Sequence, residues 1–162
     1  MSAWLTIPQR LPRTLEGLGL LALRVWLAQE FLQAGWIKLS AGWQAPEWFS
    51  QLAFPGPLAW LPANVNWVSA GMLEVLGGLA VLLGWQTRLA ACALLFVTYV
   101  AVATVHFDLG WAGWNQIDTE AGQGFKVPLM LAAMLWTLLC QGAGRWALDA
   151  RLSRAANAAS SP

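Results

Sequence analysis

Four long apolar stretches constrain this chain more than any other feature, at about residues 17–37, 65–84, 89–107 and 127–140. Of its 162 residues, 58% are hydrophobic and only 10% are charged, whereas about a quarter of the residues of a soluble domain are charged. A domain this small cannot bury so much apolar surface in water. Each stretch is close to the roughly 20 residues that cross a bilayer, the fourth being the shortest. Because lipid offers no partner to backbone groups, the stretches predict transmembrane helices.

These features predict an all-α, integral membrane four-helix bundle in one domain, residues 1–154, with a disordered C-terminal tail at 155–162. The short connection at 85–88 predicts an antiparallel hairpin of the second and third helices. The connection between the first and second helices, residues 40–64, is rich in Trp and Pro and cannot be one helix. We expect it to form an outer loop with a short interfacial helix at 46–52.

The basic residues predict the orientation in the membrane. Lys38 and Lys126 lie on one side, and six arginines lie on the other: Arg10, Arg13, Arg88, Arg145, Arg151 and Arg154. Basic residues favour the cytoplasmic side. We therefore expect a multi-pass protein of the bacterial inner membrane with both termini in the cytoplasm. The many tryptophans near the outer side are typical of anchors at the headgroup level.

Charged residues within the apolar stretches are candidates for function. Helical periodicity places Arg24 and Lys38 on one face of the first helix, with Glu30 pointing about 120° away, toward a neighbour or a second protomer. A buried Glu74 needs a cation, which predicts a pair with Lys38 or with Arg24, and His106 would cover the same cavity from outside. Such a pair either fixes the helix packing alone or belongs to a cavity that binds a quinone head group or a metal.

Several function classes are not supported by the residues. The net charge of +1 does not indicate a nucleic-acid surface. One histidine with Cys92 and Cys140 makes neither a recognisable metal site nor a disulfide scaffold, and nucleotide-binding and metalloprotease motifs are absent. We therefore expect no catalytic chemistry from this chain alone, so any redox role requires a partner or a diffusible cofactor.

Four motifs in order resemble the DoxX family. They are LRVWLAQEFLQAGWIKLS at 23–40, EVLGGLAVLLGWQTRLAA at 74–91, AVATVHFDLGW at 101–111 and GAGRWALDARL at 142–152. The resemblance covers nearly all of the predicted folded chain. It implies a polar interior site, able to hold a quinone, protons or another ligand, that is formed by Arg24, Lys38, Glu74, Arg88 and His106.

The strings FLQAGWIKL and TVHFDLGW most resemble an HvfX-like subgroup, which is encoded beside maturation enzymes for copper-binding ribosomal peptides. This resemblance implies an inner-membrane accessory protein of a copper-stress or redox-homeostasis system. Its partners would be the peptide-maturation proteins or redox proteins. Other family members, which serve quinone-linked oxidoreductases, imply a quinone-binding subunit instead. A third alternative is a structural membrane anchor for a soluble partner. Quinone and copper thus both remain candidate ligands, and a homo-oligomer remains open.

Overall fold

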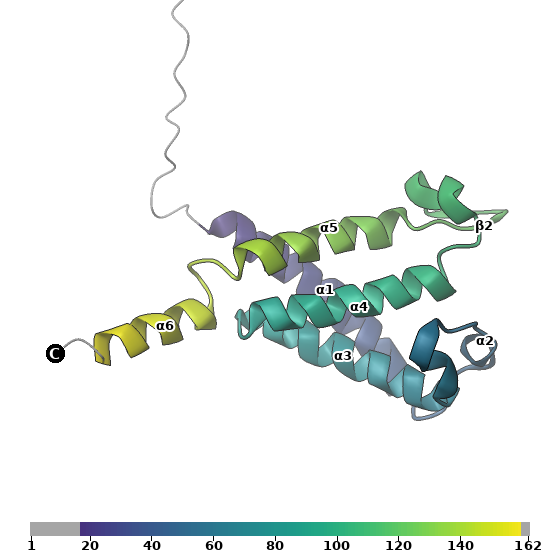
Figure 1. Cartoon of the computed structure of the whole chain (residues 1–162), viewed down its shortest axis with the longest axis horizontal. Coiled ribbons are helices and arrows are strands. Elements are labelled where there is room, and N and C mark those ends of the chain that lie inside the picture. Colours follow the sequence, from purple (N-terminus) through teal and green to yellow (C-terminus); the bar gives the residue numbers. More distant parts are fainter. Residues whose placement is uncertain (1–16, 160–162) are drawn as a thin grey trace, which may run out of the picture.

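The computed structural model describes residues 17–159, which are mostly helical, as predicted (Figure 1). Four long helices lie side by side: α1 (Leu18–Ser40), α3 (Ala63–Leu83), α4 (Thr87–Thr104) and α5 (Lys126–Gln141). Helix α1 packs mainly on α3, α3 packs on α4, and α4 packs on α5. The short connection after α3 makes α3 and α4 the predicted antiparallel hairpin.

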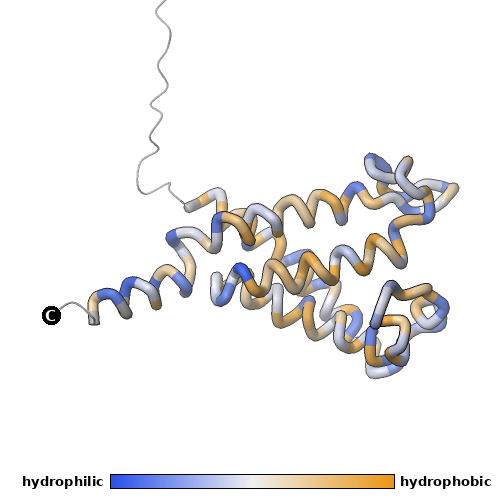
Figure 2. The backbone as a smooth tube through the Cα atoms, in the orientation of Figure 1, coloured by the Kyte–Doolittle hydropathy of each residue, from blue (hydrophilic) through white to orange (hydrophobic). Residues whose placement is uncertain are grey.

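Two of the four predicted spans are long and apolar enough to cross a membrane, α3 and α4 (Figure 2). Helix α1 is long enough but carries Arg24, Glu30 and Lys38 along its length, which lowers its hydropathy. Helix α5 is apolar but has only 16 residues, about 24 Å at 1.5 Å per residue, against a hydrocarbon core of about 30 Å.

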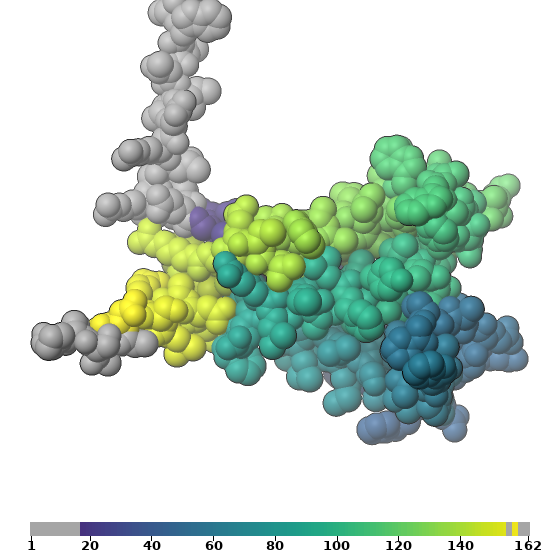
Figure 3. Space-filling model, viewed as in Figure 1, coloured from purple at the N-terminus to yellow at the C-terminus, as the bar shows by residue number. Residues whose placement is uncertain are grey.

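The loops at one end of the long helices contain short regular elements. Between α1 and α3 lie α2 (Glu47–Ser50) and the 3-10 helix η1 (Gly56–Trp60), each preceded by a proline, a residue that suits a helix start. Between α4 and α5 lie the 3-10 helix η2 (Gly110–Asn115) and a small hairpin of β1 (Asp118–Thr119) and β2 (Gly122–Gln123). The two groups of loops form two lobes at the same end of the molecule (Figure 3).

The opposite end is closed by hydrogen bonds between the α3–α4 turn and α6 (Leu148–Ala159). Gly84 ends α3 with φ 69°, a left-handed conformation that favours glycine. The Asp149 carboxylate accepts hydrogen bonds from the backbone N–H groups of Gln86 and Thr87 at 2.9 and 3.1 Å, which caps the start of α4.

Helix α6 differs from the predicted disordered tail, because it extends through residues 155–159. Its first turn carries Asp149, which suits a helix N-terminus. Alanine, the strongest helix former, dominates residues 155–159. These local preferences explain why the helix continues past Arg154.

The buried core lies between the four long helices. Gly77 of α3 lets Leu94 of α4 approach so closely that an added Cβ would lie 2.8 Å from a Leu94 methyl carbon. Small residues at helix contacts are typical of packing in membranes. The central cluster consists of Leu27, Phe31, Val81, Ala90, Ala91, Leu94, Leu135 and Leu138.

Candidate functional site: an aromatic pocket beside a buried ion pair

Lys38 of α1 and Glu74 of α3 form a partly buried ion pair. The Lys38 Nζ atom donates to both carboxylate oxygens of Glu74, at 2.9 and 2.8 Å. The Glu74 side chain is 7% exposed and the Lys38 side chain 21% exposed. This contact is the first of the two alternatives that the sequence left open. It satisfies the requirement that a buried carboxylate has a cation beside it.

Glycines bring the two helices close enough for this pair. A Cβ on Gly35 of α1 would lie 2.7 Å from the backbone oxygen of Gly71 and 2.9 Å from the Cβ of Glu74. Atoms at such distances clash, so only glycine fits at this crossing. Trp67 strengthens the same contact, because its Nε1 donates to the backbone oxygen of Lys38 at 3.1 Å and its ring lies 5.9 Å from the Lys38 ammonium, within cation–π range.

An aromatic cluster covers the ion pair from the side of the α1–α3 loop. The Phe49 ring lies 4.9 Å from the Trp67 ring and 5.1 Å from the Phe54 ring, and Trp48 lies 6.1 Å from Trp67. Edge-to-face and tilted pairs at these distances are favourable. The Asn66 side chain fixes the loop further by donating to the backbone oxygen of Leu58 at 2.9 Å.

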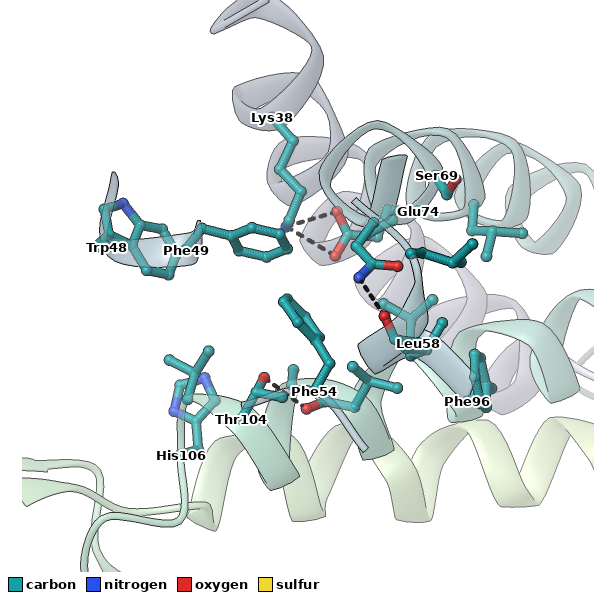
Figure 4. Close-up of a pocket in the computed structure, with 18 residues that line it drawn as sticks. Lys38, Trp48, Phe49, Phe54, Leu58, Ser69, Glu74, Phe96, Thr104 and His106 are labelled. Atoms are coloured by element: carbon teal, nitrogen blue, oxygen red, sulfur yellow. Dashed lines mark hydrogen bonds and ion pairs between the residues drawn. The ribbon is translucent and has the colours of Figure 1, made fainter. Parts of the chain in front are cut away.

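These elements enclose a cavity of about 270 Å³ between α3, α4 and the α1–α3 loop. Figure 4 shows Lys38 and Glu74 on one wall, the aromatic rings of the loop beside them, and His106 on another wall. Most of the wall is apolar. The cavity is lined mainly by Lys38, Trp48, Phe49, Phe54, Leu58, Leu61, Asn66, Ser69, Leu73, Glu74, Phe96, Val97, Val100, Thr104 and His106.

His106 follows the last turn of α4 and lines the cavity. Its half-buried position lowers the pKa of the imidazole below its ordinary value, because burial disfavours the charged form; Asp118, Asp108 and the backbone of Gly124 oppose this effect. A neutral imidazole carries one N–H donor and one acceptor nitrogen. His106 can therefore exchange hydrogen bonds with a ligand in the cavity.

Arg24 lies at the opposite end of α1. This residue is 1% exposed. Its guanidinium donates to the backbone oxygens of Val81 and Leu82, at 2.8 and 2.5 Å, and of Ala143 and Trp146, each at 3.2 Å. Val81 and Leu82 lie in the last turn of α3, where carbonyl oxygens lack their usual partners; the Val81 oxygen also accepts from the backbone N–H of Gly84 at 3.1 Å. Arg24 therefore caps α3 and holds the segment before α6.

The five residues predicted as one polar site thus separate into two groups. Lys38, Glu74 and His106 lie at the cavity, whereas Arg24 and Arg88 lie at the other end, where Arg88 donates to the backbone oxygen of Cys140 at 3.4 Å. Fourteen residues along α1 separate Arg24 from Lys38, a rise of about 21 Å. One face of a helix can therefore carry residues of two distant sites.

The aromatic lining was not predicted. The sequence predicts interfacial anchoring for the loop tryptophans, Trp48 among them, and does not single out Phe96. The sequence carries one signal for this aromatic lining, a Trp-Phe dipeptide with prolines on both sides. Prolines can fold such a segment back over the end of a helix. Within residues 17–159, no group of three or more His, Cys, Asp or Glu residues could hold a metal ion.

The chain is similar to proteins of a known family. The DoxX family model matches residues 19–107. This protein belongs to the DoxX family. An uncharacterised protein of Haemophilus influenzae is 34% identical over 141 residues, which are 86% of each chain. No solved structure matches. The matched region includes the ion pair and the whole cavity lining, His106 included, so the site lies in the part of the chain that defines the family. DoxX family proteins are membrane proteins, in agreement with the two apolar spans.

Proposed function

We propose that all four long helices cross the bacterial inner membrane, with both termini in the cytoplasm. Helix α1 contacts α3 through Arg24 at one end and through Lys38 at the other. It therefore extends along most of α3, which is apolar enough to span a membrane. The loops of the cavity end then face outward. Arg88 and the arginines of 145–154 lie at the other end, on the side that basic residues favour.

We further propose that the cavity binds a quinone head group, as the membrane subunit of an oxidoreductase. The observation that carries this proposal is the combination of an aromatic, largely apolar cavity with an ion pair on its wall. Ligand sites are typically apolar with a few placed polar groups. A quinone ring is flat and apolar, and its two carbonyl oxygens only accept hydrogen bonds.

The donors that such a ligand needs line this cavity. An ammonium has three N–H donors, and Lys38 directs two contacts to Glu74, so a third donor remains for a carbonyl oxygen. Ser69, Asn66 and His106 add further donors around the wall. Phe49, Phe54 and Phe96 supply ring faces and edges for the apolar part.

Reduction of a quinone to a quinol takes up two electrons and two protons. In this proposal a partner protein exchanges the two electrons with the head group. When a bound quinol is oxidised, the Glu74 carboxylate and the neutral His106 imidazole accept its two protons, and when a quinone is reduced, the protonated forms of the same two groups return them. Both residues line the cavity, and His106 sits outside the span where it can be reprotonated from water. The chain itself contributes binding and proton transfer.

Direct binding tests this proposal. The purified protein in detergent is titrated with a short-chain ubiquinone by calorimetry, and co-purified quinones are extracted and identified. We expect Phe96→Ala and Lys38→Met to weaken binding about tenfold or more, equivalent to about 1.4 kcal/mol. Trp43→Phe is the matched control, because Trp43 is 80% exposed and does not line this cavity. Absence of binding to the parent protein, or equal weakening by the control, contradicts the proposal.

The copper-linked accessory role and the purely structural anchor remain predictions from the sequence. Growth of a deletion strain over a copper series tests the first, with complementation by the parent and by His106→Ala. Copper sensitivity rescued only by the parent supports it. The anchor role predicts that apolar residues can replace Lys38 and Glu74 together without loss of function, since such replacements are often neutral for stability.

A further inference from the structure

The outward face of α1 carries polar side chains within the span. The core-facing side of this helix bears Arg24, Leu27, Ala28, Phe31 and Gly35. Gln29 and Gln33 lie on the opposite side and are exposed, while Glu30 is half-buried. Within residues 17–159, none of these three side chains has a hydrogen bond or ion pair. In Figure 1, α1 crosses behind the other long helices, at the edge of the packed group.

The depth of this face follows from the contacts of α1 with α3. Leu32 packs against Gly78, and Gly35 packs against Gly71 and Glu74. Gln33 therefore lies beside the middle of a helix that is apolar enough to cross a membrane. An amide that faces hydrocarbon has no hydrogen-bonding partner, which is unfavourable.

We infer that this face binds α1 of a second copy of the chain. Copies in one membrane have the same orientation, so a two-fold axis along the membrane normal places the two α1 helices in parallel and Gln33 opposite Gln33. A glutamine amide is self-complementary, because it carries both a donor and an acceptor. The amide groups can also donate to the Glu30 carboxylate of the other copy.

The chemistry of the face favours a second copy over lipid or an unrelated helix. Trp26 and Trp36 are 57% and 68% exposed and flank the polar residues, so an apolar contact surrounds the amide pair. Glutamine side chains commonly form hydrogen bonds between helices in membranes. The inference depends on the proposed topology, in which α1 crosses the bilayer, and extends beyond the ligand proposed for the cavity.

Disulfide cross-linking in membranes tests the contact. The Gln33→Cys variant is made in a chain whose Cys92 and Cys140 are replaced by alanine, and it is oxidised in native membranes. Cysteines near a two-fold axis can reach the Cα separation of about 4.4–6.8 Å that a disulfide needs. The matched control keeps Cys92 as the only cysteine, since Cys92 is exposed on α4. We expect at least fivefold more cross-linked dimer from Gln33→Cys than from the control.

A second measurement does not depend on cysteine chemistry. The dissociation constant of the dimer in lipid is measured by single-molecule photobleaching. The double variant Gln29→Leu/Gln33→Leu should raise this constant about tenfold, because it removes the equivalent of two hydrogen bonds of the usual strength between membrane helices. Unchanged thermal stability of the monomer shows that the variant folds. A parent protein that stays monomeric, or cross-links of Gln33→Cys only to a protein of different mass, overturns the inference.

Labelling separates this failure from a failure of the topology. A water-soluble maleimide should not react with Gln33→Cys in intact membranes if α1 crosses the bilayer. Rapid labelling contradicts the topology, and with it the basis for a contact within the membrane. Protection without dimer contradicts the contact alone.

Discussion

The Lys38–Glu74 pair makes an asymmetric prediction for protein stability. Lys38→Met leaves the Glu74 carboxylate, 7% exposed, without a cation. Removal of one partner from a buried pair costs about 3–5 kcal/mol. Glu74→Gln instead leaves an ammonium that is 21% exposed, on a long stem that can direct it toward the interface. This loss should be close to that of one charged hydrogen bond, about 2 kcal/mol.

The double variant Lys38→Met/Glu74→Gln should lose about 3 kcal/mol, less than the sum of the two single losses, because neither charge remains unpaired. The coupling energy is then about 2–4 kcal/mol, at or above the upper part of the usual range for residues in contact. The free energy of unfolding is measured from SDS-induced unfolding in detergent micelles, followed by tryptophan fluorescence. Lys126→Met is the control, since Lys126 lies at the same end of the molecule and forms no salt bridge among the described residues. Losses that add within about 0.5 kcal/mol refute the argument.

Three further predictions concern the surroundings of the site. Gly35→Ala should lower the free energy of unfolding by about 1–3 kcal/mol in the same SDS assay, because the added Cβ would lie 2.7 Å from a backbone oxygen; Gly19→Ala, which meets nothing within 4 Å, should not destabilise the protein. Asp149→Ala should cost about 1 kcal/mol by removal of the cap of α4, and an unchanged melting temperature would contradict the capping role. Burial lowers the pKa of His106 in the folded protein. The contribution of His106 to stability is therefore complete above the unfolded pKa of about 6.5 and declines as the pH falls through the lower folded value. Unfolding measured in a pH series from about 7.5 to 5 should show this decline for the parent and a weaker one for His106→Gln.

Much of the helical organisation could be predicted from the sequence. The apolar stretches predicted the four long helices, and the short connection at 85–88 predicted the α3–α4 hairpin, because four residues are too few to separate two helices widely. The sequence narrowed the ion-pair partner of Glu74 only to two cations, Lys38 and Arg24. The choice of Lys38 depends on how α1 aligns with α3, and the close approach at Gly35 and Gly71 sets that alignment.

The aromatic lining of the cavity could not be predicted from the sequence. Trp48 and Phe49 lie in an irregular segment, whose path depends on contacts with α3 such as the bond from Asn66 to Leu58 and the stacking on Trp67. No helical or strand periodicity exists in such a segment. The tryptophan content is explained equally well by interfacial anchoring, so the pocket becomes visible only when the loop is placed against the helices.

The two cations of α1 that contact α3, Arg24 and Lys38, differ in their surroundings. Arg24 is satisfied by four backbone oxygens at a helix end, and a structural role accounts for every one of these contacts. Lys38 and Glu74 are different, because they border an open cavity with a histidine on another wall. Packed apolar residues would often serve stability as well as a buried ion pair does. An ion pair beside an aromatic cavity therefore supports the proposed ligand with hydrogen-bond acceptors.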